Sequence, residues 1–407
     1  MSSFCYYLDM LLTRLKIELL HFFALSKKAQ RLLISYFFMS ASYPIIGTFI
    51  NAYIFKNKGD ILLLIIYNLG QFGGVSLAFF LNGLLLKKYN IKVLYFFGTL
   101  LLGIASLLIV FYPGNNLLNY FFYGLILGIG GGFHWGNRSY LTMSETHSHN
   151  RTYFTGLNFT VDTITAIVVS FVVGWLLVWG LSYQMLMAIA FLFLFCAGYI
   201  ILRSDYQTPK VNRIEVKKPT NKWWAVRWLE LSIGTSEGII FFFPSFLILS
   251  YLGHEGILGT LTATASLISA FIIYIYSRKS LVHHQFPGFI FSLVLGLITS
   301  VIFALFFSKI VITFYVLFVG FVLSFMWLNG GPMIMDRIDR EIKNQEGEKY
   351  SFIFDGEVYL NIGRSLSLLT CLTLFFIFGL TAALRFSPLI LYSFQAVIVF
   401  FLTRKLL

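Results

Sequence analysis

The chain has 407 residues, of which 58% are hydrophobic and only 12% are charged, and its mean hydropathy is +0.81. Soluble domains carry about a quarter of charged residues. So little charge cannot cover the surface of a water-soluble globule, which excludes soluble enzymes and disordered proteins. The net charge of +13 is typical of cytoplasmic loops in a membrane protein, so we expect no nucleic-acid partner.

Twelve apolar segments are each long enough to cross the hydrocarbon core of a bilayer, which takes about 20 helical residues. A membrane β-barrel would instead show short strands of alternating polarity. The continuous apolar blocks therefore predict an all-α polytopic membrane protein, embedded in a lipid bilayer. The expected spans are 30–54, 61–86, 93–112, 117–143, 153–179, 183–203, 223–251, 256–277, 286–307, 310–335, 353–379 and 384–402.

One connection, 204–222, is long, polar and basic, whereas most others are short. It divides the chain into a six-helix half at 30–203 and a second at 223–407. Residues 1–29 contain charges that interrupt the apolar run, and they predict an amphipathic helix lying on the cytoplasmic membrane surface.

The distribution of lysine and arginine predicts the orientation in the membrane. Because the number of spans is even, both termini lie on one side. That side collects 25 of the Lys and Arg residues and the other side only four, while Arg364 falls within a span. The positive-inside rule then places both termini in the cytoplasm, and we expect a multi-pass protein of the bacterial inner membrane.

The two halves resemble one another in sequence. Phe133-His134-Trp135-Gly136-Asn137 parallels Phe325-Met326-Trp327-Leu328-Asn329, 192 residues later. Tyr43-Pro44 parallels Phe243-Pro244, and Leu157-Asn158 parallels Leu360-Asn361, at offsets of 200 and 203 residues. Such a repeat of six helices relates the halves by a pseudo-two-fold axis along the membrane normal.

Helix number, central linker and repeat together resemble the major facilitator superfamily (MFS) over about residues 30–402. The loop signature of that family, G-x-x-x-D-R-x-G-R-R, is partly present after Gly83, but Lys87 stands in place of the aspartate. The G-P-x-x-G-G signature of its antiporters is absent. The segment from Phe354 to Arg364 is similar to a motif of uncharacterised bacterial members. The resemblance implies secondary transport and a central cavity lined by the first, fourth, seventh and tenth spans.

Charged side chains inside a span are costly, so each is a candidate functional residue. Arg227, Glu230 and Glu237 share one face of the span 223–251, which the resemblance places at the cavity. For Arg227 and Glu230 a static ion pair is the alternative to a role in transport. Glu237 has no cationic neighbour in its own helix.

A second group lies on one face of the span 353–379, where Glu357, Asn361 and Arg364 follow at intervals of four and three residues. Arg364 falls near the middle of the membrane and needs a carboxylate partner. Glu357 is two helical turns away, which we expect to be too far for a direct bond. Asp162 or a glutamate of the span 223–251 is the better partner, and Arg364 is then a gating or structural residue.

Proton coupling requires a membrane-embedded carboxylate that exchanges a proton as its surroundings change. Glu237 and Asp162 are the leading candidates, with Glu230 next. For Asp162 a permanent bridge to an arginine is the alternative. Arg364 cannot serve, because arginine stays charged at any accessible pH.

Polar and aromatic residues near the ends of the cavity-lining spans are candidate substrate contacts: Tyr43, Trp135, Asn137, Arg138, Arg227, Trp327 and Asn329. For the tryptophans an interfacial aromatic belt is the alternative. Gly124, Gly128, Gly132 and Gly136 recur every fourth residue and predict a helix-packing ridge.

The loop after the second span carries Lys87 and Lys88 where the family has an acid, and acids instead begin the span 353–379. We therefore predict that one of these lysines pairs with Asp355 or Glu357, which would stabilise an outward-open state by closing the cytoplasmic side.

Taken together, the sequence predicts a secondary active transporter that moves a small organic solute by alternating access. No nucleotide-binding motif, metal site or cofactor follows from the sequence, so a proton gradient is the expected energy source. An efflux pump for amphipathic compounds or drugs is the alternative. A transport-dead sensor or a membrane enzyme is a different class, and no nucleophile–base set indicates an enzyme. We expect a monomer.

Overall fold

The computed structural model describes residues 22–146, 148–211, 213–216, 219–277, 285–342 and 346–406. Residues 1–21 of the expected amphipathic segment lie outside the described residues.

The described residues form helices and contain no strand, which confirms the all-α fold. Serine, threonine, asparagine or aspartate side chains cap several helix N-termini, such as Ser182, Thr220 and Ser308, and satisfy free backbone N–H groups there. The helices are α2 (Lys27–Pro44), α3 (Ile50–Lys58), α4 (Ile61–Leu85), α5 (Ile91–Phe111), α6 (Leu117–Glu145), α7 (Ser148–Val178), α8 (Tyr183–Leu202), α9 (Asn221–Ile240), α10 (Phe243–Leu247), α11 (Glu255–Ser277), α12 (Gln285–Leu305), α13 (Lys309–Glu341), α14 (Glu346–Phe378) and α15 (Leu380–Leu406).

Each of the twelve predicted spans corresponds to one helix, or to two consecutive helices accompanied by a π-helical turn. Eleven of these in the described residues are long and apolar enough to cross a membrane. The exception is α6, in which glycines and the polar His134 and Asn137 lower the hydropathy. Helices α13 and α14 extend beyond the predicted spans by a turn or more, because their polar ends continue as helix past the apolar segment.

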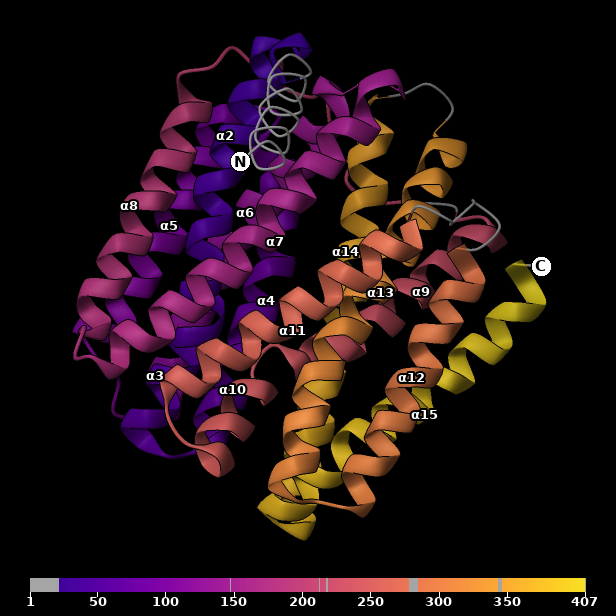
Figure 1. Ribbon diagram of the computed structural model, residues 1–407. Helices are drawn as coiled ribbons and strands as arrows, with labels where there is room; N and C mark the ends of the chain where they lie inside the picture. Colours follow the sequence, from indigo (N-terminus) through magenta and orange to yellow (C-terminus); the bar gives the residue numbers. More distant parts are fainter. Residues whose placement is uncertain are drawn as a thin grey trace, which may run out of the picture.

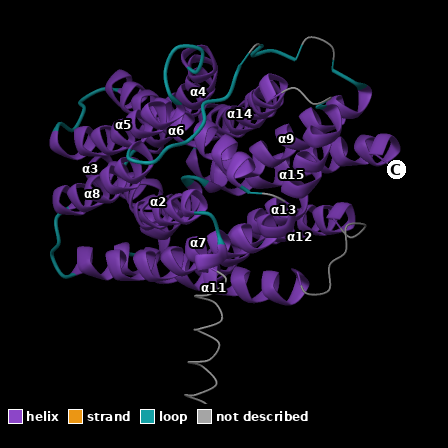
Figure 2. Ribbon diagram, turned by 90° about the horizontal axis from the view of Figure 1, so that it is seen from above, coloured by secondary structure: helices purple, strands orange, loops and turns teal. Residues whose placement is uncertain are grey.

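The spans form two halves, one from α2 to α8 and one from α9 to α15 (Figure 1). Seen from above, α4 lies beside α14 and α7 lies beside α11, so these two contacts join the halves on opposite sides of the bundle (Figure 2). The remaining space between the halves contains the candidate site.

The proline pair of the repeat marks matching breaks in the first and seventh spans. Pro44 ends α2, and a π-helical turn, Ile45–Phe49, connects it to α3. Pro244 lies in the first turn of α10, and a second π-helical turn, Ile248–Leu252, follows that helix. Proline lacks a backbone N–H and disturbs the regular helical bonding, which explains why both halves break at the same place.

The glycine ridge of α6 packs against α4. A Cβ atom at Gly124, Gly128 or Gly132 would collide with the backbone carbonyl oxygen of Tyr67, Gln71 or Val75. The predicted packing ridge is therefore confirmed, since only glycine allows the two backbones to approach so closely.

The linker between the halves packs against one end of the bundle. Tyr206, Val211 and Ile214 are buried, and the Tyr206 hydroxyl donates to the carbonyl of Lys28, 2.8 Å away. The Ser351 hydroxyl donates to the carbonyl of Arg213 at 2.6 Å. The linker thus lies at the end of the bundle where α2 begins, and we call this end the linker end.

Candidate functional site

Two adjoining cavities lie between the halves. The first, of about 420 Å³, reaches the middle of the bundle, and the second has a volume of about 370 Å³. Trp135, Ser139, Trp327 and Glu357 line both. Because the second cavity is also lined by residues from the last turns of α6 and α13, such as Met143, the site extends from mid-bundle toward the linker end.

The opposite end of the bundle is closed by contacts between the halves. The Asn51 amide donates to the carbonyl of Phe241 at 3.2 Å. Lys56 of α3 forms a 2.6 Å ion pair with Glu255 of α11. The Tyr183 hydroxyl donates to the same carboxylate at 3.0 Å. These contacts separate the cavities from that end.

Arg364 lies at the centre of a cluster of charged side chains, together with Glu237 and Glu357. Its Nε and Nη2 atoms lie 2.7 and 2.5 Å from Oε2 of Glu237, and Nη1 lies 3.0 Å from Oε1 of Glu357. The Asn361 carbonyl oxygen accepts from Nη1 at 2.8 Å, and the Trp327 indole donates to Glu237 at 2.6 Å. Of the two partners that the sequence left open for Arg364, the structure therefore selects a glutamate of α9, and Asp162 binds Arg138 instead.

The expectation that Glu357 is too far from Arg364 is wrong. Side chains of a helix point toward its N-terminus, and the long arginine stem spans the two turns back to Glu357.

Small residues bring α9 and α14 together at this cluster. A Cβ atom at Gly234 would collide with the carbonyl oxygen of Leu360, and one at Gly363 with that of Leu231. The close approach of the two backbones places Glu237 and Arg364, one from each helix, within direct bonding distance.

Arg227 pairs with Asp355 and not with Glu230, which corrects the ion pair considered above. Its Nε and Nη2 atoms each lie 2.7 Å from an oxygen of Asp355, and the Trp223 indole donates to the same carboxylate at 2.7 Å. Glu230 lies one turn further along α9, lines the second cavity and forms no ion pair with Arg227. Arg227 thus lies in a helix–helix contact and does not line the two cavities.

The predicted pair between the loop lysines and α14 is not formed in this conformation, in which the cavities extend toward the linker end; the prediction applies to the state in which that end is closed. Lys87 and Lys88 are exposed, and neither makes an ion pair with a described residue. Asp355 is bound by Arg227 and Glu357 by Arg364. Instead, α4 and α14 meet through the Tyr350 hydroxyl, which lies 3.0 Å from the Asn82 amide.

Glu230 lines the second cavity and is only 7% exposed. Within the described part of the chain it makes no hydrogen bond and no ion pair. The charged groups around it are Glu357, Asp355 and Arg364 of α14 and Glu237 of α9, and each of these is bonded to another partner. Glu230 is therefore a buried carboxylate that faces the cavity without a partner.

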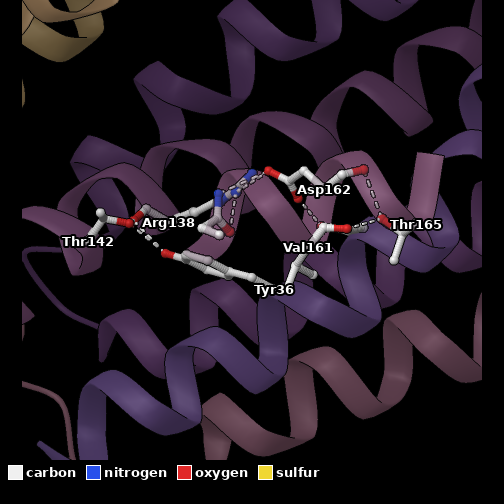
Figure 3. A network of polar contacts seen from close by, with 8 residues as sticks. Tyr36, Arg138, Thr142, Val161, Asp162 and Thr165 are labelled. Carbon is white, nitrogen blue, oxygen red and sulfur yellow. Dashed lines mark hydrogen bonds and ion pairs between the residues drawn. The ribbon is translucent and has the colours of Figure 1, made fainter. Parts of the chain in front are cut away.

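A separate network in the N-terminal half surrounds Arg138 (Figure 3). The Arg138 guanidinium lies 3.7 Å from Asp162 and donates to Asn158 at 3.2 Å. Asn158 in turn donates to Asp162 at 3.0 Å, and the Ser40 hydroxyl donates to the other carboxylate oxygen. The Asp162–arginine bridge, left open by the sequence, is thus formed in the structure.

The two tryptophans of the repeat both line the cavities, so the structure favours the cavity interpretation over an interfacial belt. Trp135 stacks edge-on with Tyr43, with ring centroids 5.9 Å apart. Arg138 lies over the Trp135 ring at 4.6 Å. Tyr43 itself lines the first cavity, as expected.

Besides Arg227, two further predicted cavity residues lie elsewhere. Asn137 and Asn82 exchange hydrogen bonds of 3.0 Å between α6 and α4. Asn329 is buried and accepts from the Tyr276 hydroxyl at 3.0 Å. Both asparagines satisfy buried polar groups between helices, and neither lines the two cavities. Each lies two residues after a cavity tryptophan, about 200° around the helix, and so points away from the cavity.

Sequence reasoning did not single out Ser139 and Tyr36. Ser139 lies one turn after Trp135, and Tyr36 lies two turns before Tyr43, so helical periodicity from the chosen residues would have found both. The Tyr36 hydroxyl lies 2.7 Å from that of Thr142 (Figure 3). Tyr36 and Ser139 both line the second cavity.

Comparison with known proteins agrees with this architecture. The chain is 25% identical over 337 residues to uncharacterized protein YqgE of Bacillus subtilis (strain 168), covering 79% of this chain and 77% of that protein. It is also 31% identical over 124 residues to an uncharacterized protein of Geobacillus stearothermophilus, covering 29% of this chain and 56% of that one.

Solved structures of transporters share the fold. The human organic anion transporter MFSD10 (TETRAN) superposes with a TM-score of 0.62 at 12% identity, over 91% of this chain and 97% of that chain. The nucleoside transporter NupG superposes with a TM-score of 0.67 at 15% identity, over 93% and 99% of the two chains. Residues 32–345 match the Major Facilitator Superfamily. The protein is a membrane transporter rather than an enzyme, and it belongs to the Major Facilitator Superfamily.

Proposed function

We propose that the protein is a secondary active transporter that moves a small organic solute by alternating access and is coupled to protons. The observation that carries this proposal is a site open toward the linker end and closed at the other end by contacts between the halves. Opening of the closed end and closing of the other would carry a bound solute across the membrane.

The orientation follows from the charges. The linker end carries most of the Lys and Arg residues, which favours the cytoplasmic side of a bacterial inner membrane. In that orientation the structure represents a cytoplasm-open conformation.

We assign the proton-coupling role to Glu230 first. Both other candidates are already paired: Glu237 is held by Arg364 and Trp327, and Asp162 by Arg138, Ser40 and Asn158. Protonation of either would weaken an ion pair. Glu230 can gain or lose a proton without breaking any bond, so a change of solvent access during transport acts on it directly.

Reconstitution with a metabolite pool tests the proposal. Proteoliposomes containing the full-length protein are given a pH gradient, and the accumulated solutes are measured by mass spectrometry. We expect gradient-dependent accumulation of at least one solute by the native protein. The Glu230→Gln variant should lose accumulation but keep exchange between equal compartments at saturating solute, because exchange moves no net proton and a high solute concentration offsets a weaker affinity.

The Glu215→Gln variant is the matched control, because Glu215 is exposed in the linker. If the native protein accumulates no solute under the gradient, the proposed transport function is wrong. If Glu230→Gln accumulates solute as well as the native protein does, proton coupling by Glu230 is wrong.

A further inference from the structure

The charged side chains of the cavity wall do not balance. Both guanidinium groups that line the cavities are already bound by carboxylates of the protein, Arg364 by two of them and Arg138 by Asp162. An anionic solute would therefore have to displace a carboxylate to reach either arginine. The residues that line the cavities, counted together with their ion-pair partners, include four carboxylates and two guanidinium groups. The carboxylates are those of Glu230, Glu237, Glu357 and Asp162, and the guanidinium groups are those of Arg138 and Arg364. The chain as a whole, in contrast, has a net charge of +13.

Glu230 has no partner in the part of the chain that the structure describes. Only 7% of its surface is exposed, and it lines the second cavity. A buried charge is costly unless an opposite charge compensates it. Arg364 is engaged by Glu237 and Glu357, and Arg227 by Asp355. Within the described residues, no cation of the protein is left to pair with Glu230, so a cation of the solute fits there.

Aromatic rings surround the same space. Trp135 and Trp327 line both cavities, and Phe72 and Phe79 line the first. The π-face of a tryptophan attracts organic cations, and Arg138 already lies over the Trp135 ring at 4.6 Å. The apolar rings would also bury the hydrocarbon part of a solute.

We infer that the cavity takes an amphipathic organic cation, whose charge pairs with Glu230 and whose apolar body packs between Trp135 and Trp327. This inference rests on the proposed transport function and names the class of its solute. Cavities of about 420 and 370 Å³ are large enough for a compact aromatic cation.

A pair of probes with the same shape and opposite charge tests the inference. Binding of tetraphenylphosphonium and of tetraphenylborate to the purified full-length protein is measured by equilibrium dialysis, with protein-free detergent micelles as the blank. We expect the cation to bind at least tenfold more tightly than the anion. Glu230→Gln should weaken binding of the cation at least tenfold and leave that of the anion unchanged, whereas Glu215→Gln should change neither.

Equal or tighter binding of the anion, no binding of either probe, or unchanged cation affinity in Glu230→Gln would overturn the inference. The result is independent of the reconstitution experiment. A protein that accumulates solutes under a pH gradient but fails this binding test is a transporter for another class of solute.

Discussion

At the scale of single residues, the site contains three carboxylates in different environments within one region. Glu237 is held by a guanidinium and an indole, Glu357 shares the same guanidinium, and Glu230 has no partner among the described residues. Removing one member of a buried ion pair leaves the other uncompensated, whereas removing an unpaired buried charge relieves a desolvation cost. The same Glu→Gln change should therefore have different effects at neighbouring positions.

We predict that Glu237→Gln lowers the midpoint of thermal unfolding in detergent, by an amount equivalent to roughly 2–3 kcal/mol. The loss is limited because Arg364 keeps Glu357. Glu230→Gln should leave the midpoint unchanged or raise it. Equal losses in both variants would mean that Glu230 has a partner that stabilises the fold.

At the scale of helices, glycine determines how closely neighbouring helices approach. The ridge of α6 brings its backbone against α4, and glycines of α9 and α14 do the same across the Arg364 cluster. The contact of α9 with α14 places charged side chains of the two helices within bonding distance. Glycine itself is unfavourable in a helix by about 0.5–1 kcal/mol relative to alanine, so its effect depends on what surrounds the added methyl group.

Two glycines of the α4–α6 pair test this point. In Gly128→Ala the new Cβ atom would collide with the Gln71 carbonyl oxygen, and we expect destabilisation on the order of 1–3 kcal/mol. In Gly73→Ala of α4 the new Cβ atom has no heavy atom within 4 Å, and we expect stabilisation of about 0.5–1 kcal/mol. Thermal unfolding of both variants in detergent gives the comparison. A stable Gly128→Ala variant would show that the helices can separate without loss.

At the scale of the whole molecule, closure of the end opposite the linker depends on a few contacts between the halves. The Lys56–Glu255 pair is one of them, and it joins a lysine side chain that is 60% exposed to a carboxylate that is 6% exposed. An exposed ion pair is worth about 0–1 kcal/mol. That is enough to shift a balance between two conformations of similar free energy.

We predict that Lys56→Gln increases access to the cavity from the closed end. The readout is the rate at which a membrane-impermeant thiol reagent labels a Ser139→Cys variant in which the native cysteines are replaced. Labelling from the closed end should rise about two- to fivefold. Lys58→Gln is the control, because Lys58 is exposed at the same end and makes no ion pair within the described residues. An equal effect of both changes would show that the pair does not stabilise closure.

The sequence by itself determined the twelve spans, the division into halves, the α6 glycine ridge and the need of Arg364 for a carboxylate. These features depend on local composition and helical periodicity, and on the cost of charge in a membrane. Only the tertiary structure decided which charges pair. Asp355 lies 128 residues from Arg227, and Arg364 lies 127 from Glu237, so each pair depends on the rotation and separation of two packed helices. Sequence placed Glu230 beside Arg227 on one helix face, but the approach of α14 gave Arg227 another partner and left Glu230 facing the cavity.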